Sequence, residues 1–109
     1  MMTERAIHQL STTQLADCIR SGELTAEDTM AHYLERIRQH DRELGAFTYV
    51  DHDQALENAR MSDIARKSGQ PAGPLAGVPF AVKDFYHVRG MPTSEGTRAF
   101  GADFVPDVD

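Results

Sequence analysis

The sequence has 109 residues, which is enough for one domain with a single hydrophobic core. Hydrophobic residues make up 40% and charged residues 26% of it, so the composition is that of a globular protein and excludes an intrinsically disordered chain. The formal net charge of −6 repels phosphate backbones and anionic lipid, so neither a nucleic acid nor a membrane surface is expected as a partner.

The single cysteine, Cys18, excludes an intramolecular disulfide and is expected to pack on the apolar side of a helix. The N-terminal sequence MMTERAIHQL lacks the basic segment and the apolar run of a secretory signal. No stretch approaches the roughly 18 consecutive apolar residues of a membrane span. These features predict a soluble, cytoplasmic protein.

Two amphipathic helices are predicted at the start of the chain. In the first, Ser11 and Gln14 have the S-x-x-Q spacing of a capping box, and Gly22 is a typical terminator. The second helix is expected to begin at Thr25 and to end near Gly45. Its apolar residues have the i, i+4, i+7 spacing of one helix face: Met30, Leu34 and Ile37.

A short strand and a third helix are predicted next. Residues 46–50, AFTYV, form a β-favouring run. The third helix is expected to begin at Asp51 or Asp53 and to end near Lys67. Its pattern is weaker than that of the first two helices. The side chains expected to face inward are Leu56, Ala59 and Ile64.

The character of the sequence changes at Gln70. From there onward come five of the eight glycines and all five prolines, which predicts turns and irregular backbone. Residues 78–84 are the one further run that favours a strand. We therefore expect two domains, a helical segment at 1–69 and the incomplete beginning of an α/β core at 70–109. One or two short strands do not complete a sheet, so a longer protein is expected.

Lys83 ends an apolar run and raises the question of why an ammonium group stands there. One interpretation is that its stem is buried while its head reaches water or pairs with an acid such as Asp84. The other is that the amine is desolvated, because burial favours the neutral form, which can act as a base or nucleophile. The spacing of residues alone does not separate these two interpretations.

Two stretches of the sequence resemble a known family. Residues 73–84, GPLAGVPFAVKD, strongly resemble the G-P-L-x-G-[IV]-P-x-x-[VI]-K-D segment of the amidase signature family. Residues 90–97, GMPTSEGT, are similar to the G-x-x-T-T-x-G-S stretch that follows it in that family. The helical lead is also similar to the family's usual opening, so the likeness covers nearly the whole chain from about Ser11.

The resemblance implies an α/β fold in which N-terminal helices pack on a mixed β-sheet core, of which this chain holds the first part. It implies a hydrolase that cleaves linear carboxamides through a Ser–cisSer–Lys triad, with no metal or organic cofactor. Lys83 is then the triad lysine, whose neutral amine draws a proton through the bridging serine and activates the second serine. Both serines belong to a later Gly/Ser-rich segment, so the chain is expected to be a fragment that is inactive alone.

Some positions depart from the family pattern. Phe85 and Tyr86 stand where the family's transamidation subunits usually have Asn and an aliphatic residue, which favours a free-standing amidase. The alternatives are the A subunit of a tRNA-dependent amidotransferase and a non-catalytic helical interaction module. The expected partner is a small-molecule amide substrate, with no nucleic acid, no membrane and a homo-oligomer as one option.

Other polar residues are assigned supporting roles. Asp84 is expected to bind backbone near the site or to orient the turn that follows the strand. Thr93 and Ser94 could line a pocket or lie exposed in a turn. Three glycines are expected to adopt backbone conformations barred to other residues: Gly77, Gly90 and Gly96. The five histidines lack metal-ligand spacing, and His87 is singled out for its closeness to Lys83.

Overall fold

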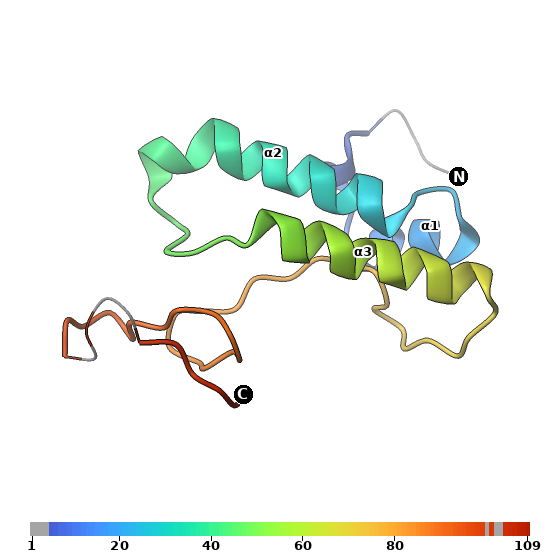
Figure 1. Cartoon of the computed structure of the whole chain (residues 1–109). Helices are drawn as coiled ribbons and strands as arrows, with labels where there is room; N and C mark the ends of the chain where they lie inside the picture. Colours follow the sequence, from blue (N-terminus) through green and yellow to red (C-terminus); the bar gives the residue numbers. More distant parts are fainter. Residues whose placement is uncertain (1–4, 100, 102–103) are drawn as a thin grey trace. The chain divides into compact units, whose positions relative to one another are not determined.

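The computed structural model describes residues 5–99, 101 and 104–109 (Figure 1). Its elements are a short 3-10 helix and three α-helices: η1 (Ile7–Gln9), α1 (Thr12–Ser21), α2 (Ala26–Leu44) and α3 (His52–Lys67). By its internal contacts the chain divides into two compact units. The helical unit comprises the described residues up to Leu44 and residues 51–79, and the second unit comprises 45–50 and the described residues from 80 onward. The expected domains at 1–69 and 70–109 stay a prediction.

The ends of α1 are those that the sequence predicts. The Ser11 hydroxyl accepts a hydrogen bond from the Gln14 N–H at 3.2 Å, and the Gln14 side chain accepts one from the Ser11 N–H at 2.9 Å. This reciprocal pair satisfies two N–H groups that a helix start leaves without intrahelical partners. Gly22 ends the helix in the left-handed region with φ 81°.

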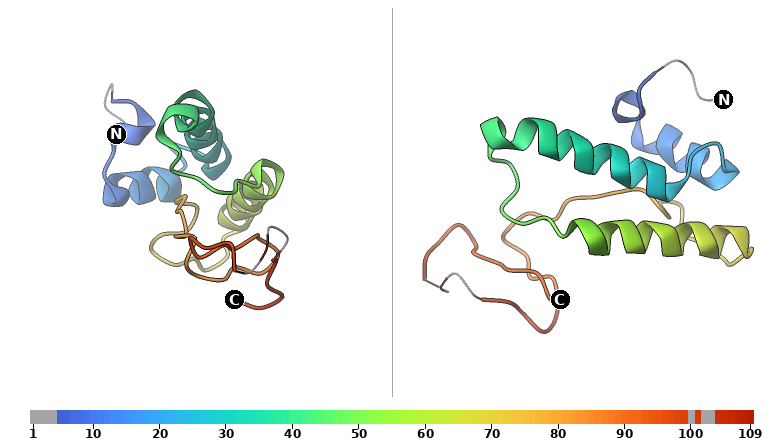
Figure 2. Two further views of the ribbon diagram at one scale, coloured as in Figure 1. Left: turned by 90° about the vertical axis from the view of Figure 1, so that its left-hand side faces the viewer. Right: turned by 45° about the horizontal axis from the view of Figure 1, so that its top comes forward.

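The N-terminus of α2 is held by two side chains, one local and one distant. The Thr25 hydroxyl accepts from the Asp28 N–H at 3.0 Å. Asp63 of α3 directs its carboxylate at the same helix start, where it accepts from the N–H groups of Ala26 at 2.8 Å and Glu27 at 3.0 Å. Negative charge is favourable at this end of a helix. Asp63 is only 7% exposed, so this contact fixes α3 beside α2 (Figures 1 and 2).

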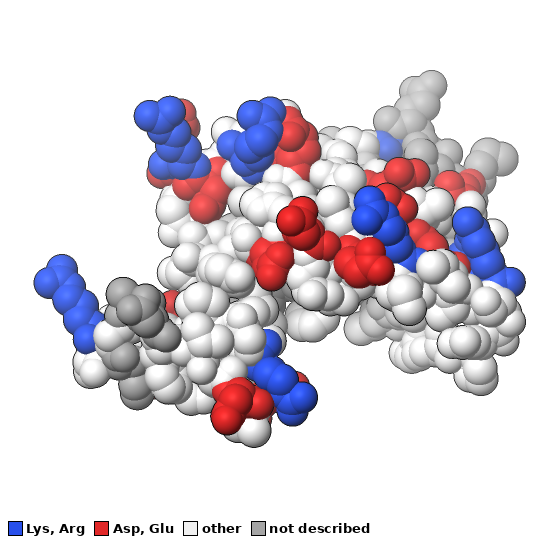
Figure 3. All heavy atoms as spheres, in the orientation of Figure 1, with Lys and Arg blue, Asp and Glu red and all other residues white. Residues whose placement is uncertain are grey.

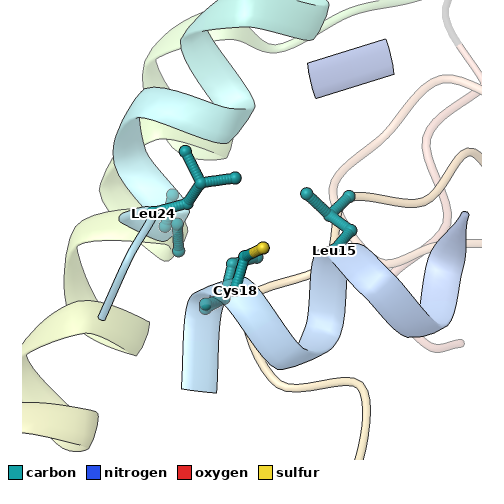
Figure 4. Close-up of a cluster of buried hydrophobic side chains, with 6 residues drawn as sticks. Leu15, Cys18 and Leu24 are labelled. Carbon is teal, nitrogen blue, oxygen red and sulfur yellow. The ribbon is translucent and has the colours of Figure 1, made fainter. Parts of the chain in front are cut away.

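The hydrophobic core lies between the helices of this unit. Figure 4 shows Leu15 and Cys18 of α1 beside Leu24, with which they form part of the buried cluster. The other members of the buried cluster are Ile19, Ala26 and Ala59. Cys18 is 8% exposed within this cluster, so the prediction of a packing cysteine is confirmed. Burial raises the pKa of its thiol, and the Glu23 carboxylate adds to the effect.

One core prediction for α3 is wrong. Ala59 is buried and Leu56 is half-buried, as expected, but Ile64 is 56% exposed. The residue before it, Asp63, faces inward in its place and binds the start of α2. A polar contact therefore sets the rotation of α3, and a hydrophobic pattern could not reveal it.

Charges of both signs are interleaved on the face of the helical unit shown in Figure 3. Glu27 of α2 pairs with Arg60 of α3 at 2.9 Å. Within α2, Glu35 accepts from Arg38, and these hydrogen bonds lower the pKa of the Glu35 carboxyl to about 2. Such exposed pairs contribute little to stability but keep the surface solvated.

The predicted strands are absent from the part of the chain that the structure describes. Residues 46–50 and 78–84 lie in irregular backbone, so the sheet of the expected α/β fold is not observed and the observed regular structure is helical. A strand requires a neighbour that bonds its N–H and C=O groups, and an apolar run cannot supply one by itself. Among the described helices, none is long and apolar enough to cross a membrane.

Gly77 explains why the first part of the Gly/Pro-rich segment lies close to the helices. It has φ 82°, and a Cβ placed there would come within 2.9 Å of Ile19 Cγ2 in α1 and 3.1 Å of Ala26 Cβ in α2. Ser62 Oγ of α3 would be 3.3 Å away. The prediction that Gly77 adopts a conformation barred to other residues is confirmed, and close packing is a second reason for glycine here.

Replacing Gly77 with alanine should destabilise the helical unit beyond the strain of a left-handed residue. Gly69, with φ 72° and no atom within 4 Å of an added Cβ, is the matched control. Both variants meet the left-handed penalty of about 1–2 kcal/mol. Gly77→Ala should cost about 1–3 kcal/mol more in urea unfolding, because the methyl group overpacks three helices. Equal losses of unfolding free energy in Gly77→Ala and Gly69→Ala would show that the close approach at Gly77 does not contribute to stability.

The carboxylate of Asp63 should be a main support of the α2–α3 pair. Asp63→Ala removes the acceptor of two helix N–H groups and should lower the free energy of unfolding by about 1–3 kcal/mol. Asp107→Ala, which removes an exposed carboxylate outside the helices, should change it by less than about 0.5 kcal/mol. Urea titration followed by circular dichroism measures both, and matching midpoints for the two variants would contradict the assignment.

Candidate active site

The second unit brings two distant stretches together around a small hollow. Thr48 and Tyr49 precede α3 in the chain, whereas the other lining residues come after the helical unit. The polar and aromatic side chains that line the hollow are Thr48, Tyr49, Lys83, Asp84, Tyr86 and Thr93. Thr48 and Tyr49 were not among the residues predicted for the site. They lie in the β-favouring run at 46–50, but that pattern did not indicate that their side chains would line a hollow.

Lys83 lines this hollow and is exposed. The apolar run before it is exposed too, with Phe80 86% and Val82 43% accessible. The described residues therefore do not supply the dry surroundings expected for the amine. An ion pair between Lys83 and Asp84, the simpler interpretation of the sequence, is also absent among the described residues, because the Asp84 carboxylate is directed elsewhere.

The backbone of Lys83 is held in a tight turn. Its carbonyl oxygen accepts hydrogen bonds from the N–H groups of Phe85 at 2.6 Å and Tyr86 at 3.1 Å. The side chains of Phe85 and Tyr86 are exposed and pack edge to face, with ring centroids 5.9 Å apart. The chain therefore turns directly after the lysine.

Asp84 binds Ser94 through both carboxylate oxygens. Oδ1 accepts from the Ser94 N–H at 2.8 Å, and Oδ2 accepts from the Ser94 hydroxyl. Both bonds lower the pKa of the Asp84 carboxyl, the one from the Ser94 hydroxyl more than the one from its N–H, so the group is a carboxylate at neutral pH. Asp84 was expected to bind backbone or to orient the turn after the strand, and it binds the Ser94 backbone N–H. Ser94, expected either in a pocket or in a turn, is part of this contact.

Ser94 opens a strained turn. The Thr97 N–H donates to the Ser94 carbonyl at 3.0 Å, and the two central residues are left-handed, with φ 52° at Glu95 and 71° at Gly96. The left-handed region suits glycine but costs energy at Glu95. Glu95 is tied by its carboxylate to His87 Nε2 at 3.1 Å. His87 thus contacts this turn, and no contact with Lys83 is present in the described part of the chain.

Backbone hydrogen bonds join the segment around Thr93 to the C-terminal described residues. The Gly90 N–H donates to the Pro106 carbonyl at 3.0 Å, and the Thr93 N–H donates to the Phe104 carbonyl at 3.1 Å. Thr93 is 5% exposed, so of the two neighbouring hydroxyl residues it is the buried one. These bonds place the 90–94 segment next to the C-terminal described residues without forming an assigned strand.

Two histidines lie close together in the helical unit. His8 Nδ1 is 2.9 Å from His32 Nε2, and the rings are stacked with centroids 5.1 Å apart. Burial, with the nearby Arg36 charge, lowers the pKa of His8. Within residues 5–99, 101 and 104–109, no group of three or more His, Cys, Asp or Glu side chains is arranged to hold a metal ion.

Comparison with known proteins decides the family. The family model described as Amidase matches residues 28–109, which include Lys83, Asp84 and Ser94. The chain belongs to the amidase family. One similar member is the A subunit of the glutamyl-tRNA(Gln) amidotransferase of Salinispora arenicola. It is 44% identical over 89 residues, which cover 82% of this chain and 18% of the relative.

Two further amidase relatives are named as the same A subunit. The protein of Streptomyces coelicolor is 42% identical, over 84% of this chain and 18% of its own length. The protein of Myxococcus xanthus is 41% identical, over 92% of this chain and 20% of its own length. The chain thus spans about a fifth of these relatives.

These relatives overturn the partner prediction. We expected a small-molecule partner and no nucleic acid, with a homo-oligomer as one option. The relatives, however, are named as one subunit of a glutamyl-tRNA(Gln) amidotransferase, and that name includes a tRNA. The prediction was wrong because it rested on the net charge of −6. That charge describes the field of 109 residues and carries no information about surfaces on other segments or subunits.

The Asp84–Ser94 contact should make the stability of the chain depend on acidity. Because the folded-state pKa of Asp84 lies below its ordinary value, the contact stabilises the fold fully above about pH 4–5 and loses this effect as the pH falls through the lowered pKa. Asp84→Asn should flatten the fall in urea midpoint between about pH 5 and pH 3. Asp107→Asn is the control, and an unchanged slope in Asp84→Asn would contradict the contact.

Proposed function

We propose that this chain is the lysine-bearing N-terminal part of an amide-cleaving enzyme, of the type named as the A subunit of glutamyl-tRNA(Gln) amidotransferase. The observation that carries the proposal is the family match over residues 28–109, together with identities of 41–44% to proteins of that name. Lys83 lies in the matched segment and lines a hollow together with Thr48, Tyr49 and Thr93. A mixed β-sheet and a cytoplasmic location are part of the same proposal.

In the proposed mechanism Lys83 is the base of a Ser–cisSer–Lys triad. Its neutral amine accepts a proton from a bridging serine, which in turn accepts the proton of the nucleophilic serine. The nucleophile forms a bond to the carboxamide carbon, and the C–N bond breaks as ammonia leaves with a proton returned by the relay. The released nitrogen serves the amidation of the glutamyl group on the tRNA. Water then frees the acyl group from the serine.

The exposure of Lys83 agrees with this proposal only if further chain covers it. Desolvation is what favours the neutral form of an amine, and an exposed position does not supply it. The exposed apolar neighbours Phe80 and Val82 are side chains that such a cover would bury. We therefore expect the 109 residues alone to be inactive.

A free-standing amidase is the second candidate. It is favoured by Phe85 and Tyr86, which stand where the family's transamidation subunits usually have Asn and an aliphatic residue. Both candidates use Lys83 in the same way, so they differ in the nitrogen acceptor. Addition of Glu-tRNA(Gln) and the companion subunits to the complete enzyme separates them, because only the first candidate forms Gln-tRNA(Gln).

Lys83→Ala in the complete enzyme should lower kcat for glutamine amide hydrolysis at least about a thousand-fold, because the nucleophile loses its base. Lys83→Arg should be equally inactive, because a guanidinium keeps its proton at neutral pH. Lys67→Ala, at the exposed end of α3, is the control and should retain full activity. Ammonia release measures all three, and normal turnover in Lys83→Ala would remove Lys83 from the mechanism.

A further inference from the structure

The contact between Asp84 and Ser94 joins two motif segments that are ten residues apart in the chain. One carboxylate accepts from both the N–H and the hydroxyl of a single residue, a bidentate arrangement that fixes orientation as well as distance. Both residues are half-buried, so the bonds are partly shielded from competing water. We name this pair of bonds the Asp84–Ser94 clasp.

The clasp lies next to a backbone segment, residues 80–84, that is not part of an assigned strand. These residues have no ladder of hydrogen bonds in the described part of the chain, so the direction in which Lys83 points depends on the turn after it and on its neighbour Asp84. The turn fixes the Lys83 carbonyl. The clasp fixes the side chain of the next residue, so the peptide between Lys83 and Asp84 is restrained from both ends.

The other end of the clasp is anchored independently. Ser94 opens the turn that contains the left-handed Glu95, and a strained residue persists only where its surroundings hold it. The Glu95 carboxylate contacts His87 at 3.1 Å, and the Thr93 N–H is bonded to the Phe104 carbonyl at 3.1 Å. The clasp therefore ties Lys83 to a restrained turn and not to a freely moving loop.

We propose that Asp84 and Ser94 are positioning residues that hold the Lys83 amine at the angle and distance its proton transfer requires. This inference rests on the proposed function of Lys83. Neither residue is assigned contact with the substrate, and both act through the lysine backbone. A displacement of about 1 Å at a reacting group costs about a hundred-fold in rate, which is the scale on which such a clasp would act.

The test compares kcat and KM in the complete enzyme for matched variants at each end of the clasp. Asp84→Ala should lower kcat about 10- to 100-fold and leave KM within about three-fold, because the lysine is misplaced while the substrate still binds. Asp84→Asn keeps one acceptor oxygen and should recover part of the loss. Ser94→Ala should lose about ten-fold in kcat, whereas Ser94→Thr, which keeps the N–H and a hydroxyl, should remain near wild type.

The double variant shows whether the two residues act as one unit. Asp84→Ala combined with Ser94→Ala should be no slower than the worse single variant, because the same contact is lost only once. Losses that multiply would overturn the inference, as would wild-type kcat in Ser94→Ala. Should Asp84→Ala fail to fold, the comparison of Ser94→Ala with Ser94→Thr decides, with equal kcat in the two counting against the clasp.

The Lys83 variants separate this inference from the proposed function. If Lys83→Ala is inactive while Asp84→Ala turns over normally, the positioning role falls and the function of Lys83 stands. If Lys83→Ala is fully active, the proposed function falls and the positioning role falls with it. Asp107→Ala, an exposed carboxylate of the same unit, is the control and should match wild type in kcat and KM.

Discussion

The close approach of the Gly77 backbone to all three α-helices is the constraint on which the helical unit depends. Ile19, Ala26 and Ser62 leave room for a hydrogen atom at this position and for no larger substituent. The backbone around Gly77 can therefore lie against the helices, where Val78 packs on their buried cluster. A glycine of the family motif thus serves packing, in addition to the left-handed conformation that the motif alone suggests.

Two aspartates perform the same physical task at different places. Asp63 accepts two backbone N–H groups at the start of α2, and Asp84 accepts the N–H and hydroxyl of Ser94 at the start of a turn. A short carboxylate is suited to this because it brings two acceptors to donors that regular structure leaves unpaired. Asp63 thereby fixes one helix against another, whereas Asp84 joins the residue after Lys83 to the turn that begins at Ser94.

The sequence predicts well what depends on neighbouring residues. The capping box at Ser11, the terminator at Gly22 and the start of α3 at Asp51 are local devices, and all are found as expected. What depends on distant residues was missed, since nothing in the pattern around Asp63 indicates the helix end that it binds. The strand prediction at 78–84 failed for the same reason, because an apolar run becomes a strand only when another strand is present.

The site shows the same division between local and distant causes. The identity of the segment around Lys83 follows from its sequence, as does the expectation that Asp84 binds backbone nearby. The environment of the amine does not, because desolvation is produced by whatever packs over Phe80, Val82 and the hollow. In the proposed mechanism Lys83 must be neutral to act, and it would reach that form only when the exposed apolar side chains beside it are buried. In the proposed enzyme, folding of the remaining segments and activation of Lys83 would then be one event, which would link amide cleavage to completion of the fold.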